Sequence, residues 1–122
     1  MKKIFKPKHT LISALLIFMA GFFSCGSIAP SEKIKEWVHR GALIVDVRTP
    51  QEFAAGNISG SVNIPLAEIE NRLDEFGSKN GYIIVYCRTG NRSGRAEAFL
   101  KSQGYINVIN GGGLQDMLKA LQ

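Results

Sequence analysis

One short stretch of the sequence combines residue types that can perform nucleophilic chemistry. It consists of Cys87 and the six residues after it, Arg88, Thr89, Gly90, Asn91, Arg92 and Ser93. The apolar run before Cys87 predicts a buried strand that ends at the cysteine, and a helix is predicted to begin near Ser93. Backbone N–H groups of so short a loop can converge on the sulfur, and the following helix presents its positive end. These groups and the two arginines lower the pKa of a thiol, so the stretch predicts a thiolate nucleophile.

The simpler alternative is an inert buried cysteine beside two solvated arginines, because free cysteine is among the most buried residue types. Gly90, which lets the backbone curl without a Cβ clash, and the arginines at 88 and 92 favour a working site instead. Cys25 and Cys87 are the only cysteines of the sequence, so no disulfide framework supports the fold. We therefore expect Cys87 to be catalytic and residues 88–93 to bind the substrate.

The elements that must position this loop alternate between strands and helices. Apolar β-branched runs predict the strands, and apolar residues at helical spacing between glycine or proline boundaries predict the helices. Thr49 and Glu52 have the spacing of a capping box, with proline in the first helical turn. Gly111–Gly113 is expected to be a turn. Strands are expected at 42–47, 61–64, 82–86 and 106–109, and helices from an N-cap at Ser31 to Gly41, from Pro50 to Gly56, and at 66–76, 93–103 and 114–121.

This alternation predicts an α/β fold, with a small parallel β-sheet flanked by helices on both faces. In such sheets, sites lie beyond the carboxyl ends of the strands. Asp46 and Arg48 lie at the end of the strand expected at 42–47, which places them at the same edge as Cys87. They could support the site. We favour structural roles for both, with Arg48 paired to Glu52 and Asp46 accepting hydrogen bonds from backbone amides.

Three motifs in this order resemble those of rhodanese-type sulfurtransferases. Residues 87–93 resemble the active-site loop of that family, and residues 46–53 and 56–65 resemble its two upstream motifs. The similarity runs from about residue 31 to the C-terminus. The chain is therefore identified as a single-domain, exported member of the family, with a rhodanese-like domain over residues 31–122.

The resemblance implies a mechanism. The Cys87 thiolate attacks the outer sulfur of a sulfane donor such as thiosulfate, sulfite leaves, and loop N–H groups hold the resulting persulfide. A thiophilic acceptor, cyanide in vitro or a thiol in the cell, then removes the sulfur. Arg88 and Arg92 would bind the anionic donor. No cofactor is expected, and no metal either, because His9 lies in the N-terminal segment and His39 stands alone.

Other functions use similar loops. Phosphatases and arsenate reductases also hold an oxyanion above an acidic cysteine, but they place arginine six positions after it, where this sequence has Ser93. A thioredoxin-like oxidoreductase would need a second cysteine near Cys87. A different class of function stays open, namely a persulfide carrier or a partner-binding module with little turnover. No exposed apolar stripe calls for a dimer, so we expect a monomer.

The first 24 residues are expected to be an export signal. Residues 1–10 are cationic, and residues 11–23 form an almost unbroken apolar run, shorter than the about 20 residues of a membrane-spanning helix. Phe22-Phe23-Ser24-Cys25 resembles the cleavage site of bacterial lipoproteins, which would make Cys25 a lipidated N-terminus followed by a short linker at 25–30. The alternative is ordinary cleavage nearby, for example after Gly26. Either way we expect a periplasmic protein, anchored to a membrane if Cys25 is lipidated.

The positive charge of the chain is concentrated in this signal. The formal net charge is +5, but four of the 15 Lys and Arg residues lie among the first eight residues. From Cys25 onward, 11 cationic side chains face 10 anionic ones. A nearly neutral body has no field to attract a polyanion, so nucleic-acid binding is not expected.

Overall fold

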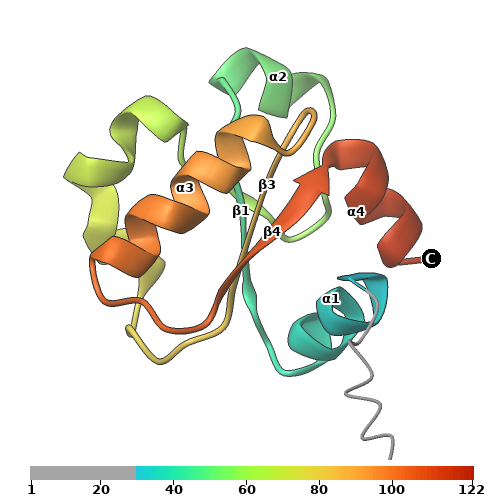
Figure 1. The fold of residues 1–122 in the computed structure, drawn as a ribbon. Coiled ribbons are helices and arrows are strands. Elements are labelled where there is room, and N and C mark those ends of the chain that lie inside the picture. The colour runs from blue at the N-terminus through green and yellow to red at the C-terminus, as the bar shows by residue number, and fades with distance from the viewer. Residues whose placement is uncertain (1–29) are drawn as a thin grey trace, which may run out of the picture.

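The computed structural model describes residues 30–122, and the expected export signal and Cys25 lie outside the described residues (Figure 1). Helices and strands alternate along the described chain, as predicted. Its elements are α1 (Pro30–His39), β1 (Leu43–Asp46), α2 (Pro50–Ala55), β2 (Val62–Asn63), the 3-10 helix η1 (Leu66–Phe76), β3 (Ile83–Cys87), α3 (Asn91–Ser102), β4 (Val108–Gly113) and α4 (Leu114–Ala120).

The four strands form one parallel sheet in the order β2-β1-β3-β4. β1 and β3 pair in register from Leu43↔Ile83 to Asp46↔Tyr86, so the carboxyl ends of these strands lie side by side. This edge carries Cys87, the last residue of β3. The predicted α/β fold and the predicted place of the thiol at the carboxyl edge are confirmed.

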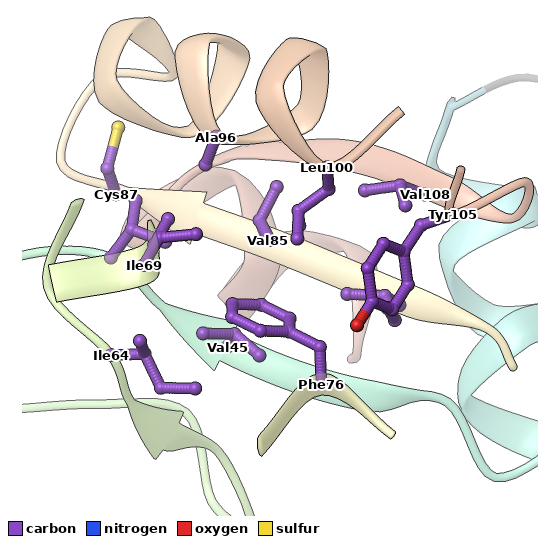
Figure 2. Close-up of a cluster of buried hydrophobic side chains, with 12 residues drawn as sticks. Val45, Ile64, Ile69, Phe76, Val85, Cys87, Ala96, Leu100, Tyr105 and Val108 are labelled. Atoms are coloured by element: carbon purple, nitrogen blue, oxygen red, sulfur yellow. The ribbon is translucent and has the colours of Figure 1, made fainter. Parts of the chain in front are cut away.

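Helices cover both faces of the sheet, with η1 and α3 on one face and α1 and α4 on the other (Figure 1). Side chains of a strand alternate between the faces, and β3 contributes to both layers. Ile83, Val85 and Cys87 pack in the η1–α3 layer. Figure 2 shows Val85 and Cys87 in this layer. Ile84 and Tyr86 pack in the α1–α4 layer. A strand buried on both faces is what its continuous apolar run predicts.

The start of α2 follows the sequence prediction. The Thr49 hydroxyl accepts the Glu52 N–H at 3.2 Å, and the Glu52 carboxylate accepts the Thr49 N–H at 3.3 Å, which completes the capping box. The start of α1 differs, because the helix already includes Pro30 and Ser31 is therefore not its N-cap. Proline suits the first helical turn, where its missing N–H has no intrahelical partner.

The segment 66–76 is helical, as predicted, but it is a 3-10 helix with a kink at Arg72. Its apolar residues explain the difference. Leu66 and Ile69, like Leu73 and Phe76, are three residues apart, and this spacing aligns side chains in a helix with three residues per turn. The four-residue step between the two pairs contains the kink.

The prediction of a turn at Gly111–Gly113 is wrong, because β4 continues through these glycines. Val85 pairs with Asn110 and Cys87 pairs with Gly113, so β4 has one extra residue opposite β3 and forms a β-bulge. Gly112 has a φ of +84°, which a side chain would disfavour. The bulge brings β4 against the start of the Cys87 loop.

One further apolar assignment needs correction. Ile106, predicted to begin a strand, is 67% exposed and precedes β4. In α4, Met117 and Ala120 are buried, whereas Leu118 is exposed. Within residues 30–122, no helix has the length and apolar character needed to cross a membrane.

Candidate active site

The Cys87 thiol lies at the junction of β3 and α3. Cys87 ends β3, residues 88–90 form the loop, and α3 begins at Asn91, two residues earlier than predicted. The Cys87 side chain has no exposed surface and lies beneath the first turn of α3 (Figure 2). The N-terminal end of α3 therefore presents its free N–H groups and positive polarity to the sulfur.

Hydrogen bonds from the loop and from α3 reach the sulfur. The Gly90 N–H lies 3.0 Å from Sγ, and the Ser93 hydroxyl oxygen lies 3.2 Å from it. Burial raises the pKa of the Cys87 thiol, but the hydrogen bonds from the Ser93 hydroxyl and from the N–H groups of Ser93, Thr89 and Gly90 outweigh it, so the pKa is lowered. The loop is thus built to hold negative charge on sulfur, as the sequence predicted.

Among the groups that lower the pKa of Cys87, the Ser93 hydroxyl contributes most, so we expect Ser93→Ala to raise that pKa. The measurement is the rate of Cys87 alkylation against pH, followed by mass spectrometry on the Cys87 peptide. Ser102→Ala is the matched control, because its hydroxyl donates to the Phe99 carbonyl at the far end of the same helix. An unchanged alkylation profile in Ser93→Ala would contradict the assigned hydrogen bond.

The loop is anchored to the bulged end of β4. Gly90 has a φ of +92°, and a Cβ there would lie 3.4 Å from the Gly112 Cα. The Asn110 side chain donates to the Gly90 carbonyl at 2.8 Å and accepts the Gly112 N–H at 2.9 Å. Gly113 leaves no room for a side chain either, because its Cβ would overlap the Arg88 carbonyl oxygen. The glycines of β4 are therefore what allows the loop to fold so closely against the sheet.

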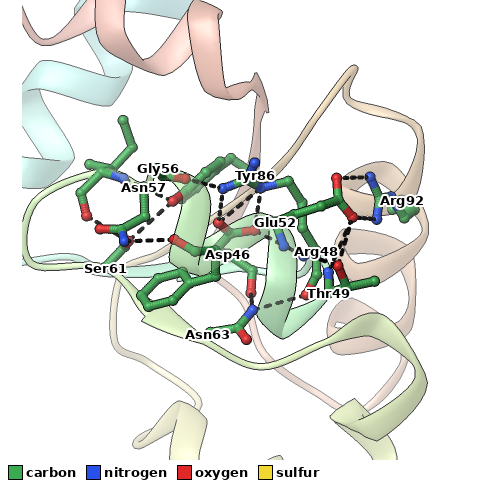
Figure 3. A network of polar contacts seen from close by, with 12 residues as sticks. Asp46, Arg48, Thr49, Glu52, Gly56, Asn57, Ser61, Asn63, Tyr86 and Arg92 are labelled. Atoms are coloured by element: carbon green, nitrogen blue, oxygen red, sulfur yellow. Dashed lines mark hydrogen bonds and ion pairs between the residues drawn. The ribbon is translucent and has the colours of Figure 1, made fainter.

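Asp46 and Arg48 form a buried ion pair at the same edge (Figure 3). Arg48 Nη2 lies 2.6 Å from Asp46 Oδ2, and Arg48 Nε lies 2.9 Å from Asp46 Oδ1. Asp46 also accepts the backbone N–H of Arg48, and Arg48 Nη2 donates to the Gly56 carbonyl at 2.6 Å. Both charges are satisfied inside the fold, which supports the structural roles favoured from the sequence. The expected pairing of Arg48 with Glu52 is wrong.

Glu52 instead pairs with Arg92 of the loop helix (Figure 3). Arg92 Nη1 and Nη2 lie 2.7 and 3.0 Å from the two carboxylate oxygens, a bidentate arrangement. The Arg92 hydrogen bonds lower the pKa of Glu52 to about 2. The pair is therefore fully ionised at neutral pH, and Glu52 balances much of the charge that Arg92 was expected to offer an anionic donor.

A cavity of about 530 Å³ lies beside the loop, between η1 and α3. Leu66 and Phe99 give it apolar walls, and Arg92 and Arg95 of α3 give it cationic groups. Cys87 itself does not line the cavity, and Arg92 in the first turn of α3 is the member of residues 87–93 that does.

The structure brings the predicted site residues together to different extents. Gly90 and Ser93 contact the sulfur, whereas Arg88, Thr89 and Asn91 are exposed around it. None of the hydrogen bonds or ion pairs found within 30–122 involves the Arg88 guanidinium, which is available to an anion. Sequence reasoning missed Asn110 and Gly113 as parts of the loop's support. In the described part of the chain, no group of three His, Cys, Asp or Glu side chains is arranged to hold a metal ion.

The comparisons with known proteins address the family. The family model described as rhodanese-like domain matches residues 31–119. The chain belongs to the rhodanese-like family. The prediction of a rhodanese-type sulfurtransferase, made from three motifs, is thereby confirmed.

Individual relatives agree with this assignment. Thiosulfate sulfurtransferase PspE of Escherichia coli K12 is 39% identical over 74 residues, which cover 60% of this chain and 71% of that protein. Thiosulfate sulfurtransferase GlpE of Pseudomonas aeruginosa is 36% identical over 83 residues, 68% of this chain and 74% of that protein. The matched part spans 63% of a sulfurtransferase from Allochromatium vinosum. The solved structure of the human single-domain sulfurtransferase TSTD1 aligns with a TM-score of 0.64 at 27% identity, covering 71% of this chain and 90% of that one.

Proposed function

We propose that this rhodanese-like protein moves sulfane sulfur from thiosulfate, or a similar anionic donor, to a thiophilic acceptor through a persulfide on Cys87. The observation that carries the proposal is the preformed set of hydrogen-bond donors around the Cys87 sulfur, which lowers the pKa of the thiol against its burial. The names of relatives such as PspE and GlpE support the choice of thiosulfate as donor.

The first step loads the sulfur. The Cys87 thiolate attacks the outer sulfur of thiosulfate, a bond forms between Sγ and that sulfur, and the S–S bond of the donor breaks. The electron pair of the broken bond leaves with sulfite, and the negative charge of the enzyme passes to the outer sulfur of the persulfide. The Gly90 N–H and the Ser93 hydroxyl are already oriented toward the Cys87 sulfur, so stabilising the attacking thiolate needs little reorganisation.

The second step transfers the sulfur from the persulfide to the acceptor. The lone pair of an acceptor, cyanide or a thiolate, attacks the outer sulfur, and the bond to Sγ breaks with its electrons returning to Cys87. Sγ then carries the charge of a leaving group, which the Gly90 N–H and the Ser93 hydroxyl stabilise at 3.0 and 3.2 Å. Protons and electrons balance over the two steps without a cofactor.

We expect Glu52→Gln to improve the use of thiosulfate. The substitution removes a carboxylate that is ionised at neutral pH and leaves Arg92 with uncompensated charge beside the loop. We expect kcat/KM for thiosulfate to rise roughly threefold at low ionic strength and to approach the wild-type value in high salt. Steady-state kinetics at two salt concentrations measure this.

Glu75→Gln is the matched control, since it makes the same charge change in the Arg72 pair at the far end of η1. The control should leave kcat/KM unchanged. A fall of kcat in Glu52→Gln with an unaltered KM would instead mean that Glu52 is needed to orient Arg92.

The function itself is tested by thiosulfate:cyanide sulfurtransfer with the wild-type chain and Cys87→Ser. Intact mass after exposure to thiosulfate is recorded in parallel. We expect thiocyanate production by wild type, a gain of one sulfur atom in its mass, and neither in the variant. The stability of Cys87→Ser is checked by thermal unfolding, so that loss of activity is not confused with loss of fold.

Two other outcomes would redirect the proposal. A stable gain of sulfur with negligible turnover would favour a persulfide carrier, a role that the name of one relative, the putative sulfur carrier protein YrkF of Bacillus subtilis, also suggests for that protein. No gain of sulfur and no turnover in the folded wild-type chain would refute thiosulfate as the donor.

We further propose that the chain is exported to the periplasm and held at a membrane by a lipid on Cys25. The support is the cationic and apolar pattern of residues 1–23 and the lipoprotein-like sequence before Cys25. Cell fractionation of the wild type and of Cys25→Ala tests it. Only the wild type should sediment with membranes. An equal distribution of the wild type and Cys25→Ala between the membrane and soluble fractions would contradict a lipid anchor on Cys25.

A further inference from the structure

Asn110 of β4 directly precedes Gly111–Gly113, and its side chain is hydrogen-bonded to the loop that follows Cys87. Its Nδ2 donates to the Gly90 carbonyl at 2.8 Å, and its Oδ1 accepts the Gly112 N–H at 2.9 Å. These two partners fix the orientation of the amide, because a carbonyl needs a donor and an N–H needs an acceptor. Oδ1 is thereby held 2.7 Å from the Ser93 hydroxyl oxygen.

The Ser93 hydroxyl has more acceptors than protons. Its oxygen lies 2.7 Å from Asn110 Oδ1, 3.2 Å from Cys87 Sγ and 3.4 Å from the Gly112 carbonyl oxygen. A hydroxyl has a single proton to donate. When that proton points to Sγ, the Ser93 oxygen and Asn110 Oδ1 face each other without a proton between them, which is unfavourable. The sulfur and Asn110 therefore compete for one hydrogen bond.

We propose that Asn110 is a positioning residue that acts on Cys87 through Ser93. Its Oδ1 accepts the hydrogen bond of the Ser93 hydroxyl while Sγ is uncharged, and the hydroxyl turns to donate to Sγ when that sulfur carries negative charge. The proposal rests on the proposed function, because the persulfide is the state in which Sγ is neutral and the charge lies on the outer sulfur. Asn110 thus favours the loaded state and moderates the acidity of the free thiol.

This moderation has a chemical use. A thiolate loses intrinsic nucleophilicity as the pKa of its thiol falls, and attack is fastest when that pKa is close to the ambient pH. A hydroxyl committed permanently to Sγ would make more thiolate but a poorer nucleophile. With Asn110 as a competitor, the hydrogen bond strengthens only as charge returns to Sγ when the sulfur leaves for the acceptor.

The two residues that carry the proposal are uncharged, so replacing them alters no formal charge near the thiol. The charged groups on the elements packed around the loop stay the same in every variant: Arg88 of the loop, Arg92 of α3, Glu52 of α2, Asp46 and Arg48 at the end of β1, and Asp116 of α4. A shift in the pKa of Cys87 in these variants therefore reports the hydrogen bonds.

The test is a double-mutant cycle of Asn110→Leu and Ser93→Ala in the full chain. Asn110 is exposed on the edge strand β4, so we expect the fold to tolerate leucine, which is of similar size. The readout is the pH dependence of Cys87 alkylation by iodoacetamide, followed on the tryptic peptide Asn80–Arg88, which separates it from Cys25. Leucine also removes the Gly90 anchor, and the cycle subtracts this effect because the anchor is lost in both backgrounds.

The expected result is a coupling between the two residues. The effect of Asn110→Leu on the pKa of Cys87 is measured once with Ser93 present and once in the Ser93→Ala background. With Ser93 present, Asn110→Leu should leave that pKa about half a unit lower than its effect in the other background accounts for. The same shift of pKa in both backgrounds would show that Asn110 only anchors the loop and would overturn the proposal. Asn110→Ala, which introduces no new bulk, repeats the cycle if the leucine variant unfolds.

Alkylation of Cys87 needs neither a sulfur donor nor an acceptor, so this cycle is independent of the sulfurtransfer assay. A coupling without any sulfurtransfer would support the competition for the Ser93 proton while the proposed function fails. Sulfurtransfer without a coupling would leave the function in place and remove the role of Asn110.

Discussion

Gly113→Ala is expected to abolish most of the sulfurtransfer activity while leaving a folded protein. A Cβ at this position would overlap the Arg88 carbonyl oxygen and lie 3.0 Å from the Arg88 carbonyl carbon, so the backbone of the loop has to move. Displacement of preorganised N–H donors from a developing charge costs about a hundredfold in rate or more. We therefore expect kcat/KM to fall by about that factor and the pKa of Cys87 to rise, measured by sulfurtransfer kinetics and by alkylation against pH.

Gly111→Ala provides the matched control two residues earlier in the same bulge. Its Cβ would meet the Met117 sulfur and, at 3.0 Å, the Ile84 Cγ2, which belong to the layer on the opposite face from Cys87. We expect a loss of stability of about 1–3 kcal/mol from overpacking, with near-normal kcat/KM at a temperature where the variant is folded. Equal losses of activity in both variants would contradict a specific role for Gly113 in shaping the loop.

Arg48→Met is expected to destabilise the protein strongly. The substitution leaves the Asp46 carboxylate, which has no exposed surface, without its guanidinium partner. Breaking a buried pair from one side costs about 3–5 kcal/mol, because an uncompensated charge remains inside the fold. Equilibrium unfolding in urea measures this as a fall in the midpoint with an unchanged slope.

Arg92→Met makes the same substitution in a pair whose side chains are about one third exposed, and it should cost roughly 1 kcal/mol or less. In the double variant Asp46→Asn/Arg48→Met the uncompensated charge is gone, so part of the lost stability should return. If Arg48→Met were no more costly than Arg92→Met, the buried pair could not be a main support of the edge that carries the site.

The fold was predictable from the sequence wherever one local pattern dominated. The continuous apolar run before Cys87 gives a strand buried on both faces, and Thr49 and Glu52 form the expected capping box. The prediction of a turn at Gly111–Gly113 was wrong, because three glycines favour a turn locally while pairing with β3 keeps them in a strand. That outcome depends on a tertiary contact that no local pattern contains.

The site was predictable to the extent that it lies in one segment. Cys87, Gly90 and Ser93 fall within seven residues, and their chemistry follows from their types and spacing. The partner of Arg92 lies 40 residues earlier in α2, and Arg48 reaches back to Asp46 instead. Side-chain direction at the sheet edge decides between such partners. For Asn110 the sequence offers one weak signal, a polar amide at the end of an apolar strand. Its role at the loop could not be predicted, because that role depends on the β-bulge beside it.

The thiol lies at the end of an internal strand of the sheet, which has consequences for hydrogen exchange. β3 is paired on both sides and all its side chains are buried, so its amides should exchange only when the whole domain opens. The exposed residues Arg88 and Thr89 follow directly and should exchange through local opening. We therefore expect the sulfur to be attached to one of the most protected segments of the described chain, and the exposed loop residues beside it to be among the least protected. A boundary in exchange protection is expected between Cys87 and Arg88, so that the loop can open locally while the strand that carries the thiol stays closed.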